Sequence, residues 1–177
     1  NILGSNFSFD MEVSLTGDSY VAGEETALME AIEGKRSTPR FKPPFPANFG
    51  LYGKPTTINN TQSLASVPSI IRNGAEWFKD IGVENSGGTA QFSVSGHIEK
   101  PGNYELPMGT SFKDLLELCG GVLGGAKLKA VIPGGSSVPV MTAETILGCT
   151  MDYDSLQKAG SSFGTGAVIV MDETTCM

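Results

Sequence analysis

Two adjacent carboxylates at the start of an expected helix are the first candidates for ligand chemistry. Gly23-Glu24-Glu25-Thr26 opens this helix, and a glycine without a Cβ lets a ligand approach the backbone closely. Adjacent helical positions point about 100° apart, so we expect the two carboxylates to face different partners. Carboxylates in a first turn also stabilise the helix dipole by about 0.3–1 kcal/mol each. On residue types alone, this plain role is the favoured interpretation.

The proline-rich segment 39–46 combines stiffness with a cation and a flat apolar ring. Its prolines restrict the backbone, while Lys42 and Phe45 suit a phosphate and an aromatic heterocycle, as in a nucleotide. The alternative is a rigid surface loop or a proline-rich interaction peptide, and the residue types by themselves favour that alternative.

A third polar stretch, Thr56-Thr57-Ile58-Asn59-Asn60, offers hydroxyls and amides to the polar edge of a ring or to a phosphate. Threonine and asparagine also cap helices and form turns routinely, so capping is the competing interpretation. The three motifs together make a surface that suits a nucleotide without deciding for one.

Composition narrows the classes of partner. A net charge of -7 with scattered lysines and arginines argues against nucleic-acid binding and against a basic membrane-binding face. The apolar stretches are too short to cross a bilayer, so we expect no direct membrane insertion. His97, the only histidine, has no cysteine or carboxylate at ligand spacing, so we expect an ordinary half-buried side chain and not a base or a metal ligand. Three widely spaced cysteines predict neither disulfides nor a metal site.

The elements that must position these residues fall into two regions. In the first, residues 1–80, helical periodicity predicts helices over 23–33 and 67–78, with Pro68 in the first turn of the second. The proline-rich stretch 37–60 predicts an irregular connection. Before the first helix, alternation predicts a strand whose apolar side is formed by Phe9, Met11, Val13 and Leu15.

The second region covers residues 81–174 and has the pattern of a small sheet. The predicted elements are a strand over 90–96, a hairpin turn at 100–103, a helix capped by Ser111 and ended by Gly120, and strands over 128–132 and 164–171. This order is that of a ubiquitin-like β-grasp. Glycine-rich loops at 120–125 and 133–137 could line a ligand, but tight turns are the favoured interpretation.

Taken together and in order, these motifs closely resemble the 51-kDa flavoprotein subunits of NADH:quinone oxidoreductase, the respiratory complex I. The matching stretches are 20–28, 33–36, 39–40, 42–46, 53–60, 95–97, 107–110, 130–137 and 151–154. The likeness covers essentially the whole chain, which therefore looks like an internal fragment of such a subunit.

The resemblance implies an α/β plus α+β fold in three parts. Residues 1–80 would be the C-terminal half of a Rossmann-like domain that binds FMN and NADH. Residues 81–174 would be a ubiquitin-like β-grasp, or soluble-ligand-binding, domain, and 175–177 the start of an iron–sulfur helical domain. In that family NADH stacks on the flavin, hydride passes to FMN, and electrons leave through iron–sulfur clusters toward quinone. The hydride chemistry belongs to the cofactors, and the protein supplies position and charge.

The same resemblance assigns roles to individual residues. Lys42 and Phe45 would lie on the NADH side of the site, and Glu25, the catalytic candidate, would contact the nicotinamide. The residues that would line the flavin are Tyr20, Gly23, Glu24, Glu25, Asn59 and Asn60. The implied cofactors are FMN and NAD. The implied partners are the other subunits of the peripheral arm of complex I, at the cytoplasmic face of the bacterial inner membrane or the matrix side of the mitochondrial one.

Departures from the family pattern affect the expected activity. Residues 16–22 read Thr-Gly-Asp-Ser-Tyr-Val-Ala, where the family has Gly-Ala-Gly-Ala-Tyr-Ile-Cys. The upstream glycine-rich segment that contacts the flavin phosphate is missing, and so is the downstream cysteine motif that ligates a [4Fe–4S] cluster. We therefore expect these 177 residues alone to bind FMN poorly and to oxidise no NADH, with the cluster confined to the parent protein.

Three other functions remain open. The parent could be the diaphorase subunit of an NAD-linked hydrogenase or formate dehydrogenase, which shares these motifs. The chain could instead be a non-catalytic module whose β-grasp domain holds a small ligand such as a cobalamin or a saccharide. Finally, it could be a structural piece that docks other subunits. This interpretation would be supported if Glu25 and Lys42 pointed away from any shared cleft.

Overall fold

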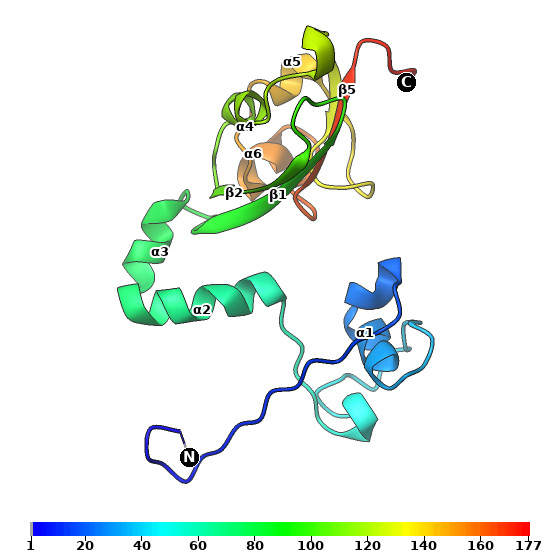
Figure 1. Ribbon diagram of the computed structural model, residues 1–177, viewed down its shortest axis with the longest axis vertical. Coiled ribbons are helices and arrows are strands. Elements are labelled where there is room, and N and C mark those ends of the chain that lie inside the picture. Colours follow the sequence, from blue (N-terminus) through cyan, green and yellow to red (C-terminus); the bar gives the residue numbers. More distant parts are fainter. Residues whose placement is uncertain (1) are drawn as a thin grey trace. The chain divides into compact units, whose positions relative to one another are not determined.

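The chain forms two compact units. The computed structural model describes residues 2–177, with one unit ending at Thr61 and the other running from Gln62 to Met177 (Figure 1). Nearly all of helix α2 (Thr61–Asn73) and the whole of α3 (Ala75–Ile81) group with the second unit in this division. The expected domain boundary, between residues 80 and 81, falls at the last residue of α3 and stays a prediction.

The first unit is built around helix α1 (Glu25–Ile32), with two short 3₁₀ turns, η1 (Tyr20–Gly23) and η2 (Leu51–Gly53). The helix expected over 23–33 is confirmed. Its buried residues are Thr26, Ala27, Met29 and Ala31. Thr26 and Met29 are three positions apart and Ala27 and Ala31 four, the spacings of neighbours one helical turn apart. The connection expected to be irregular over 37–60 has no regular element apart from η2.

The prediction of a strand near the N-terminus is wrong. Residues 7–19 have no regular secondary structure, and the side chains that alternate there are exposed, Met11 by 83% and Leu15 by 96%. A strand needs a second strand to accept and donate its backbone hydrogen bonds, and no segment of the described residues pairs with this one. An alternating pattern of apolar residues is therefore compatible with a strand, but the strand forms only where a second strand pairs with it.

The single helix expected over 67–78 is two helices. Helix α2 begins at Thr61, so Pro68 lies inside it and not in its first turn. The proline lacks an N–H, and its carbonyl oxygen accepts a hydrogen bond from Arg72 Nε at 3.2 Å. Gly74 separates the two helices at φ 92°, a left-handed conformation that glycine adopts without a steric penalty.

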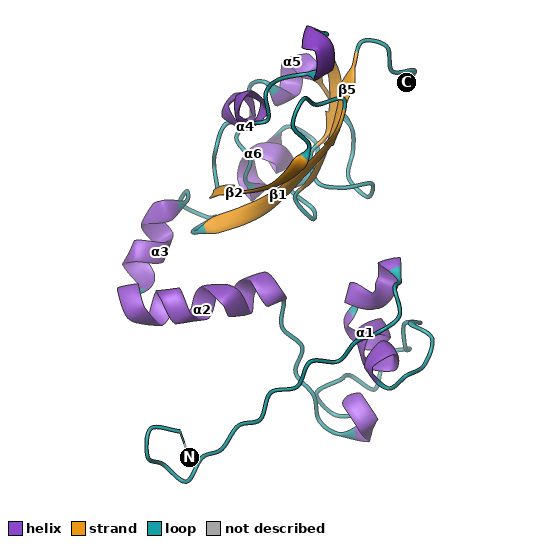
Figure 2. Cartoon of the chain, viewed as in Figure 1, coloured by secondary structure: helices purple, strands orange, loops and turns teal. Residues whose placement is uncertain are grey.

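The second unit contains a five-stranded mixed sheet in the order β2-β1-β5-β3-β4 (Figures 1 and 2). The strands are β1 (Thr89–Gly96), β2 (Gly102–Pro107), β3 (Leu128–Ile132), β4 (Met141–Thr142) and β5 (Ala167–Asp172). Strands β1 and β5 pair in parallel and the other neighbours are antiparallel. The expected hairpin and both later strands are confirmed, and the topology fits the β-grasp description.

Three short helices pack on one face of this sheet. They are α4 (Phe112–Leu118), α5 (Ala143–Ile146) and α6 (Tyr153–Lys158), and a 3₁₀ turn, η3 (Leu123–Gly125), follows α4. Helix α4 begins as expected, because Ser111 Oγ accepts the backbone N–H of Asp114 at 3.1 Å. Strand β4 and helices α5 and α6 were not expected, since each is too short to show a clear period.

The core between sheet and helices combines strand residues, one or two residues from each helix, and loop residues such as Met151 and Phe163. Burying a large apolar side chain completely contributes roughly 1.5–3 kcal/mol, so this cluster dominates the stability of the second unit. Its fully buried members include Phe92, Val131, Val168 and Val170 from the strands and Phe112, Leu115, Ile146 and Leu156 from the helices.

The glycine loop at 133–137 belongs to the packing of this unit. A Cβ on Gly134 would lie 2.3 Å from the carbonyl oxygen of Phe163, so the two loops approach too closely for any other residue. This agrees with the favoured interpretation of the loop as a tight turn. Among residues 2–177, none of the helices combines the length and apolar character that crossing a bilayer requires.

Candidate functional site

Three of the expected site residues meet in one charged cluster. The ammonium group of Lys42 contacts Glu25 Oε1 and lies 3.6 Å from Glu24 Oε1. All three side chains are between 32% and 40% exposed, so each is partly shielded and still accessible to a ligand. The hydrogen bond to Glu25 is the main cause that raises the pKa of Lys42, which keeps this cation charged.

Glu24 has two tasks, one for each carboxylate oxygen. Its Oε2 accepts the Thr26 hydroxyl at 2.6 Å and the backbone N–H groups of Thr26 and Ala27 at 2.9 and 2.8 Å, which makes Glu24 the N-cap of α1. Its Oε1 faces Lys42. The Thr26 hydroxyl, followed by the Ala27 N–H, lowers the pKa of Glu24, so the carboxylate stays ionised.

The expectation that the two adjacent carboxylates face different partners is wrong. Both approach Lys42. The rule for adjacent helical positions does not apply here, because Glu24 is the extended residue before the helix, with ψ 135°, and only Glu25 is helical. The site therefore concentrates two negative charges around one positive charge at the N-terminus of α1.

The segment that carries Lys42 is attached to the rest of the unit on both sides. Before Lys42, the backbone N–H of Arg40 donates to Thr26 Oγ at 2.8 Å. After it, the carbonyl oxygen of buried Pro46 accepts the backbone N–H of Thr56 at 2.9 Å. The Lys42-Pro43 and Pro43-Pro44 peptide bonds between these anchors are cis. The two hydrogen bonds fix where the lysine side chain starts.

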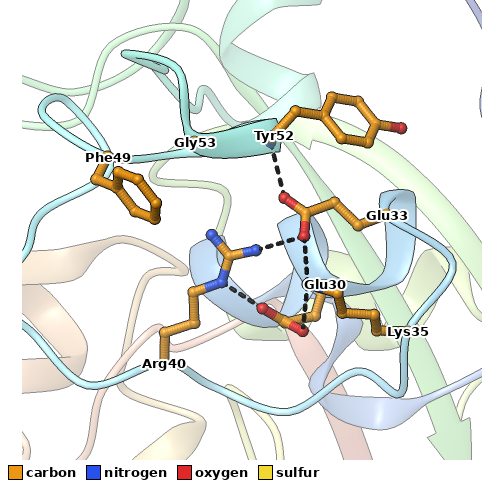
Figure 3. A pocket seen from close by; sticks show the side chains of 7 residues that line it. All are labelled: Glu30, Glu33, Lys35, Arg40, Phe49, Tyr52 and Gly53. Carbon is orange, nitrogen blue, oxygen red and sulfur yellow. Dashed lines mark hydrogen bonds and ion pairs between the residues drawn. The ribbon is translucent and has the colours of Figure 1, made fainter.

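Arg40 is the centre of a second charged cluster, which the sequence did not single out (Figure 3). Its Nε contacts Glu30 Oε1, its Nη2 lies 3.0 Å from Glu33 Oε2, and its Nη1 donates to the Gly50 carbonyl oxygen at 3.2 Å. Lys35 donates to Glu33 at 2.8 Å and is the largest cause that lowers the pKa of Glu33 to about 2. The network lines a cavity of about 640 Å³ together with Phe49, Tyr52 and Gly53.

The remaining expected site residues lie exposed in the same unit. Tyr20 in η1 is 94% exposed and the ring of Phe45 is 55% exposed. Gly23 faces open space, since a Cβ there would meet no atom within 4 Å. Asn59 and Asn60 lie exposed in the segment just before α2. Their parts in a flavin site stay predictions.

His97 has a carboxylate partner that its sequence neighbourhood did not reveal. Its Nδ1 lies 3.1 Å from Asp172 Oδ1, at the place where β5 ends, and its side chain is 42% exposed. The two residues are 75 positions apart, so no local spacing could indicate the contact. The expectation of an ordinary half-buried side chain agrees with this placement.

Comparison with known proteins gives matches along both units. The Nuo51 FMN-binding domain matches residues 3–69, and the SLBB domain matches residues 91–141. The F subunit of the NADH-quinone oxidoreductase of Rickettsia bellii is 54% identical over 177 residues, which cover 99% of this chain and 42% of the relative. The corresponding protein of Rickettsia typhi is 52% identical over the same shares.

A solved structure resembles the chain as well. The crystal structure of an NAD+-reducing [NiFe]-hydrogenase in the H2-reduced state superimposes with a TM-score of 0.77 and 34% sequence identity, covering 90% of this chain and 27% of that one. The air-oxidised state of an NAD+-reducing [NiFe]-hydrogenase gives a TM-score of 0.74.

Along the chain, the match to an FMN-binding domain is followed by the match to an SLBB domain. Over nearly its whole length the chain is similar to the 51-kDa, or F, subunits of NADH-quinone oxidoreductase, as the resemblance of its motifs had indicated. It spans less than half the length of the curated relatives it matches.

Proposed function

We propose that the chain is part of a flavoprotein subunit that takes hydride from NADH onto FMN and passes the electrons through iron–sulfur clusters to quinone. The observation that carries this proposal is the cluster of Glu24, Glu25 and Lys42, which lies within the stretch matched by the FMN-binding domain. Partly exposed charges of both signs at one helix terminus suit a ligand that has both donors and acceptors.

The residues present fit a flavin and a nicotinamide. Glu25 offers a carboxylate to amide and hydroxyl donors, and Lys42 offers an ammonium to phosphate or carbonyl oxygens. Gly23 leaves the backbone open, and the exposed ring of Phe45 offers a flat apolar face. FMN, when bound, supplies the hydride acceptor. The chain supplies binding, orientation and charge.

The two carboxylates differ in their freedom to respond to a ligand. Glu24 is held by three cap bonds, so it keeps its position. Glu25 is paired with Lys42 at the surface, and such a pair contributes little in water, so a ligand can replace it. A nicotinamide amide that donates to Glu25 would release Lys42 toward an oxygen of the ligand. Glu25 is thus the residue proposed to contact the nicotinamide.

The remaining roles follow the family assignment. Tyr20, Gly23, Glu24, Asn59 and Asn60 would line the flavin, with Lys42 and Phe45 on the NADH side. Residues 1–80 would be the FMN- and NADH-binding part, 81–174 the β-grasp domain and 175–177 the start of the iron–sulfur domain. The partners would be the other peripheral-arm subunits of complex I, at the cytoplasmic face of the bacterial inner membrane or the mitochondrial matrix side.

A diaphorase subunit of an NAD-linked hydrogenase is the second candidate. The superposition on an NAD+-reducing [NiFe]-hydrogenase over 90% of this chain favours it specifically. The hydride-transfer site would be the same in both cases, because only the destination of the electrons differs. Mass spectrometry of the subunits that co-purify with the native protein separates the two: quinone-linked subunits support the first, and hydrogenase subunits the second.

A flavin titration tests the proposed site. The protein, extended at both ends to the length of its relatives, is titrated with FMN while flavin fluorescence is followed. Glu25→Gln and Lys42→Ala are compared with Glu144→Gln and Lys127→Ala, which change exposed residues of the second unit. We expect stoichiometric FMN binding by the wild type and the two controls, and weaker binding or an altered flavin spectrum in the site variants. Absence of FMN binding to the wild type would contradict the proposal.

A further inference from the structure

One buried hydroxyl joins the two parts of the charged cluster. Thr26 is only 1% exposed, and its Oγ donates to Glu24 Oε2 at 2.6 Å. The same oxygen accepts the backbone N–H of Arg40 at 2.8 Å, 14 residues further along the chain. Because a buried donor or acceptor without a partner costs about 1–3 kcal/mol, both bonds resist breaking. Thr26 therefore bridges the N-cap of α1 and the segment that carries Lys42.

The guanidinium of Arg40 provides a second attachment for the segment 39–46, which carries Lys42. It reaches Glu30 and Glu33 on the opposite end of α1 and the carbonyl oxygen of Gly50. Glu33 is itself fixed, because its Oε1 accepts the backbone N–H of Tyr52 at 2.8 Å. A planar guanidinium with several simultaneous acceptors has a defined orientation, unlike a flexible ammonium. Arg40 is thus fixed through its backbone N–H and through its side chain, whose contacts with Glu30 and Glu33 are drawn in Figure 3.

These contacts determine the position of Lys42. The lysine follows Arg40 by two residues and is followed by Pro43 and Pro44, so little backbone freedom separates it from the anchored residue. A long lysine side chain has several rotatable bonds, and only a fixed starting point keeps its ammonium group near Glu24 and Glu25. A shift of the segment would move the cation away from both carboxylates.

We propose that Thr26 and Arg40 are positioning residues, which set the distance between the Lys42 ammonium and the Glu24 and Glu25 carboxylates and thereby the affinity of the site for NADH. This inference rests on the proposed function and deepens it, because neither residue needs to touch a cofactor. Thr26 acts through its hydroxyl, and Arg40 through its backbone N–H and its guanidinium.

Hydrogen exchange measures the bridge without any cofactor. Of the eight residues 39–46, four are prolines without an N–H, which leaves the amides of Arg40, Phe41, Lys42 and Phe45. Thr26→Val keeps the shape of the side chain and removes its hydroxyl, whereas Thr26→Ser keeps the hydroxyl. In the extended protein, mass spectrometry should show one protected amide in this segment for the wild type and Thr26→Ser. Thr26→Val should lose that protection.

Kinetics then measure the positioning role in the same proteins. We expect Thr26→Val to raise the KM for NADH about tenfold with little change in kcat, the effect of losing one hydrogen bond to a charged group, and Thr26→Ser to restore it. Arg40→Lys, which keeps the charge and loses the planar group, should raise KM as well, while Arg36→Lys at an exposed position should not. Circular dichroism checks whether each variant is folded. If Thr26→Val does not fold, Arg40→Lys provides the test.

The outcomes separate the inference from the function on which it rests. If the protected amide of the segment 39–46 exchanges equally slowly in the wild type and in Thr26→Val, the inference is overturned. It is also overturned if a variant that has lost this protection keeps a KM for NADH within twofold of the wild-type value. A wild-type protein that neither binds FMN nor oxidises NADH would instead contradict the proposed function.

Discussion

The ammonium group of Lys42 lies 3.6 Å from Glu24 Oε1, while the other oxygen of that carboxylate caps helix α1. One side chain thus links the start of the helix to a residue 18 positions later. The relationship has two consequences. The helix N-terminus and the proline-rich segment form one site, and the cap of the helix is also part of the charge arrangement that a ligand would meet.

Loss of the cap should loosen α1 locally. Glu24→Ala removes the acceptor of three hydrogen bonds, and replacing an N-cap typically costs about 1 kcal/mol of helix stability. We expect the amides of Thr26 and Ala27 to exchange roughly fivefold faster, as that free energy implies. Hydrogen exchange of the peptide that contains α1 measures this. Glu12→Ala, at an exposed position outside any regular element, is the control and should change nothing in this peptide.

Acid should weaken the contacts around Glu33 in a defined pH range. The pKa of this carboxyl is lowered from 4.5 to about 2, chiefly by Lys35 and then by the Tyr52 N–H and Arg40. Because the folded-state pKa is depressed, the stabilisation is complete above pH 4.5 and disappears as the pH falls toward 2. Carbon-13 NMR of labelled glutamates should show Glu33 titrating last. Its titration at an ordinary pKa would disprove the network.

Gly96 should be irreplaceable at the end of β1. It has φ 87°, and a Cβ would lie 2.2 Å from the carbonyl oxygen of Val170, so Gly96→Ala combines strain with a backbone clash. We expect a loss of more than about 2 kcal/mol in the free energy of unfolding. Gly121→Ala is the matched control, since Gly121 has φ 84° but open space around it, and should lose only about 1 kcal/mol. Urea denaturation followed by circular dichroism compares them; equal losses would show that the clash relaxes.

The 177 residues by themselves should bind FMN weakly and should not reduce ferricyanide with NADH. The charged cluster is present, but the flavin phosphate contacts assigned by family resemblance to an upstream glycine-rich segment are not among these residues. Fluorescence titration and an NADH-to-ferricyanide assay of the isolated chain check this. Stoichiometric FMN binding with turnover would show that these two units suffice for activity. It would also mean that the contacts with the flavin phosphate lie within these 177 residues.

The sequence predicted the elements whose signals are local. Helix α1 has a regular apolar period, and β1 alternates because its one face is buried, as Phe92 and Val94 show. The stretch with Met11 and Leu15 alternates equally well but forms no strand, because a strand also depends on a distant partner.

Family resemblance, and not the residue types alone, selected the members of the candidate site, and it did not predict their contacts. Glu24, Glu25 and Lys42 were expected together from family resemblance, but the turn of Glu24 toward Lys42 follows from its extended backbone, which no residue type specifies. Thr26 and Arg40 contribute through hydrogen bonds between residues 14 positions apart. Such contacts leave no periodic signal, so only the folded structure reveals them.

Steady-state oxidation of NADH by the extended protein tests the central claim, that Glu25 and Lys42 form part of the hydride-transfer site. The wild type, Glu25→Gln, Lys42→Ala and the double variant are assayed with ferricyanide, with Glu144→Gln and Lys127→Ala as controls. We predict that each site variant loses at least about tenfold in kcat/KM and that the double variant loses less than the product of the two, because paired residues are coupled. Values of kcat/KM in both single variants within twofold of the controls would contradict the claim.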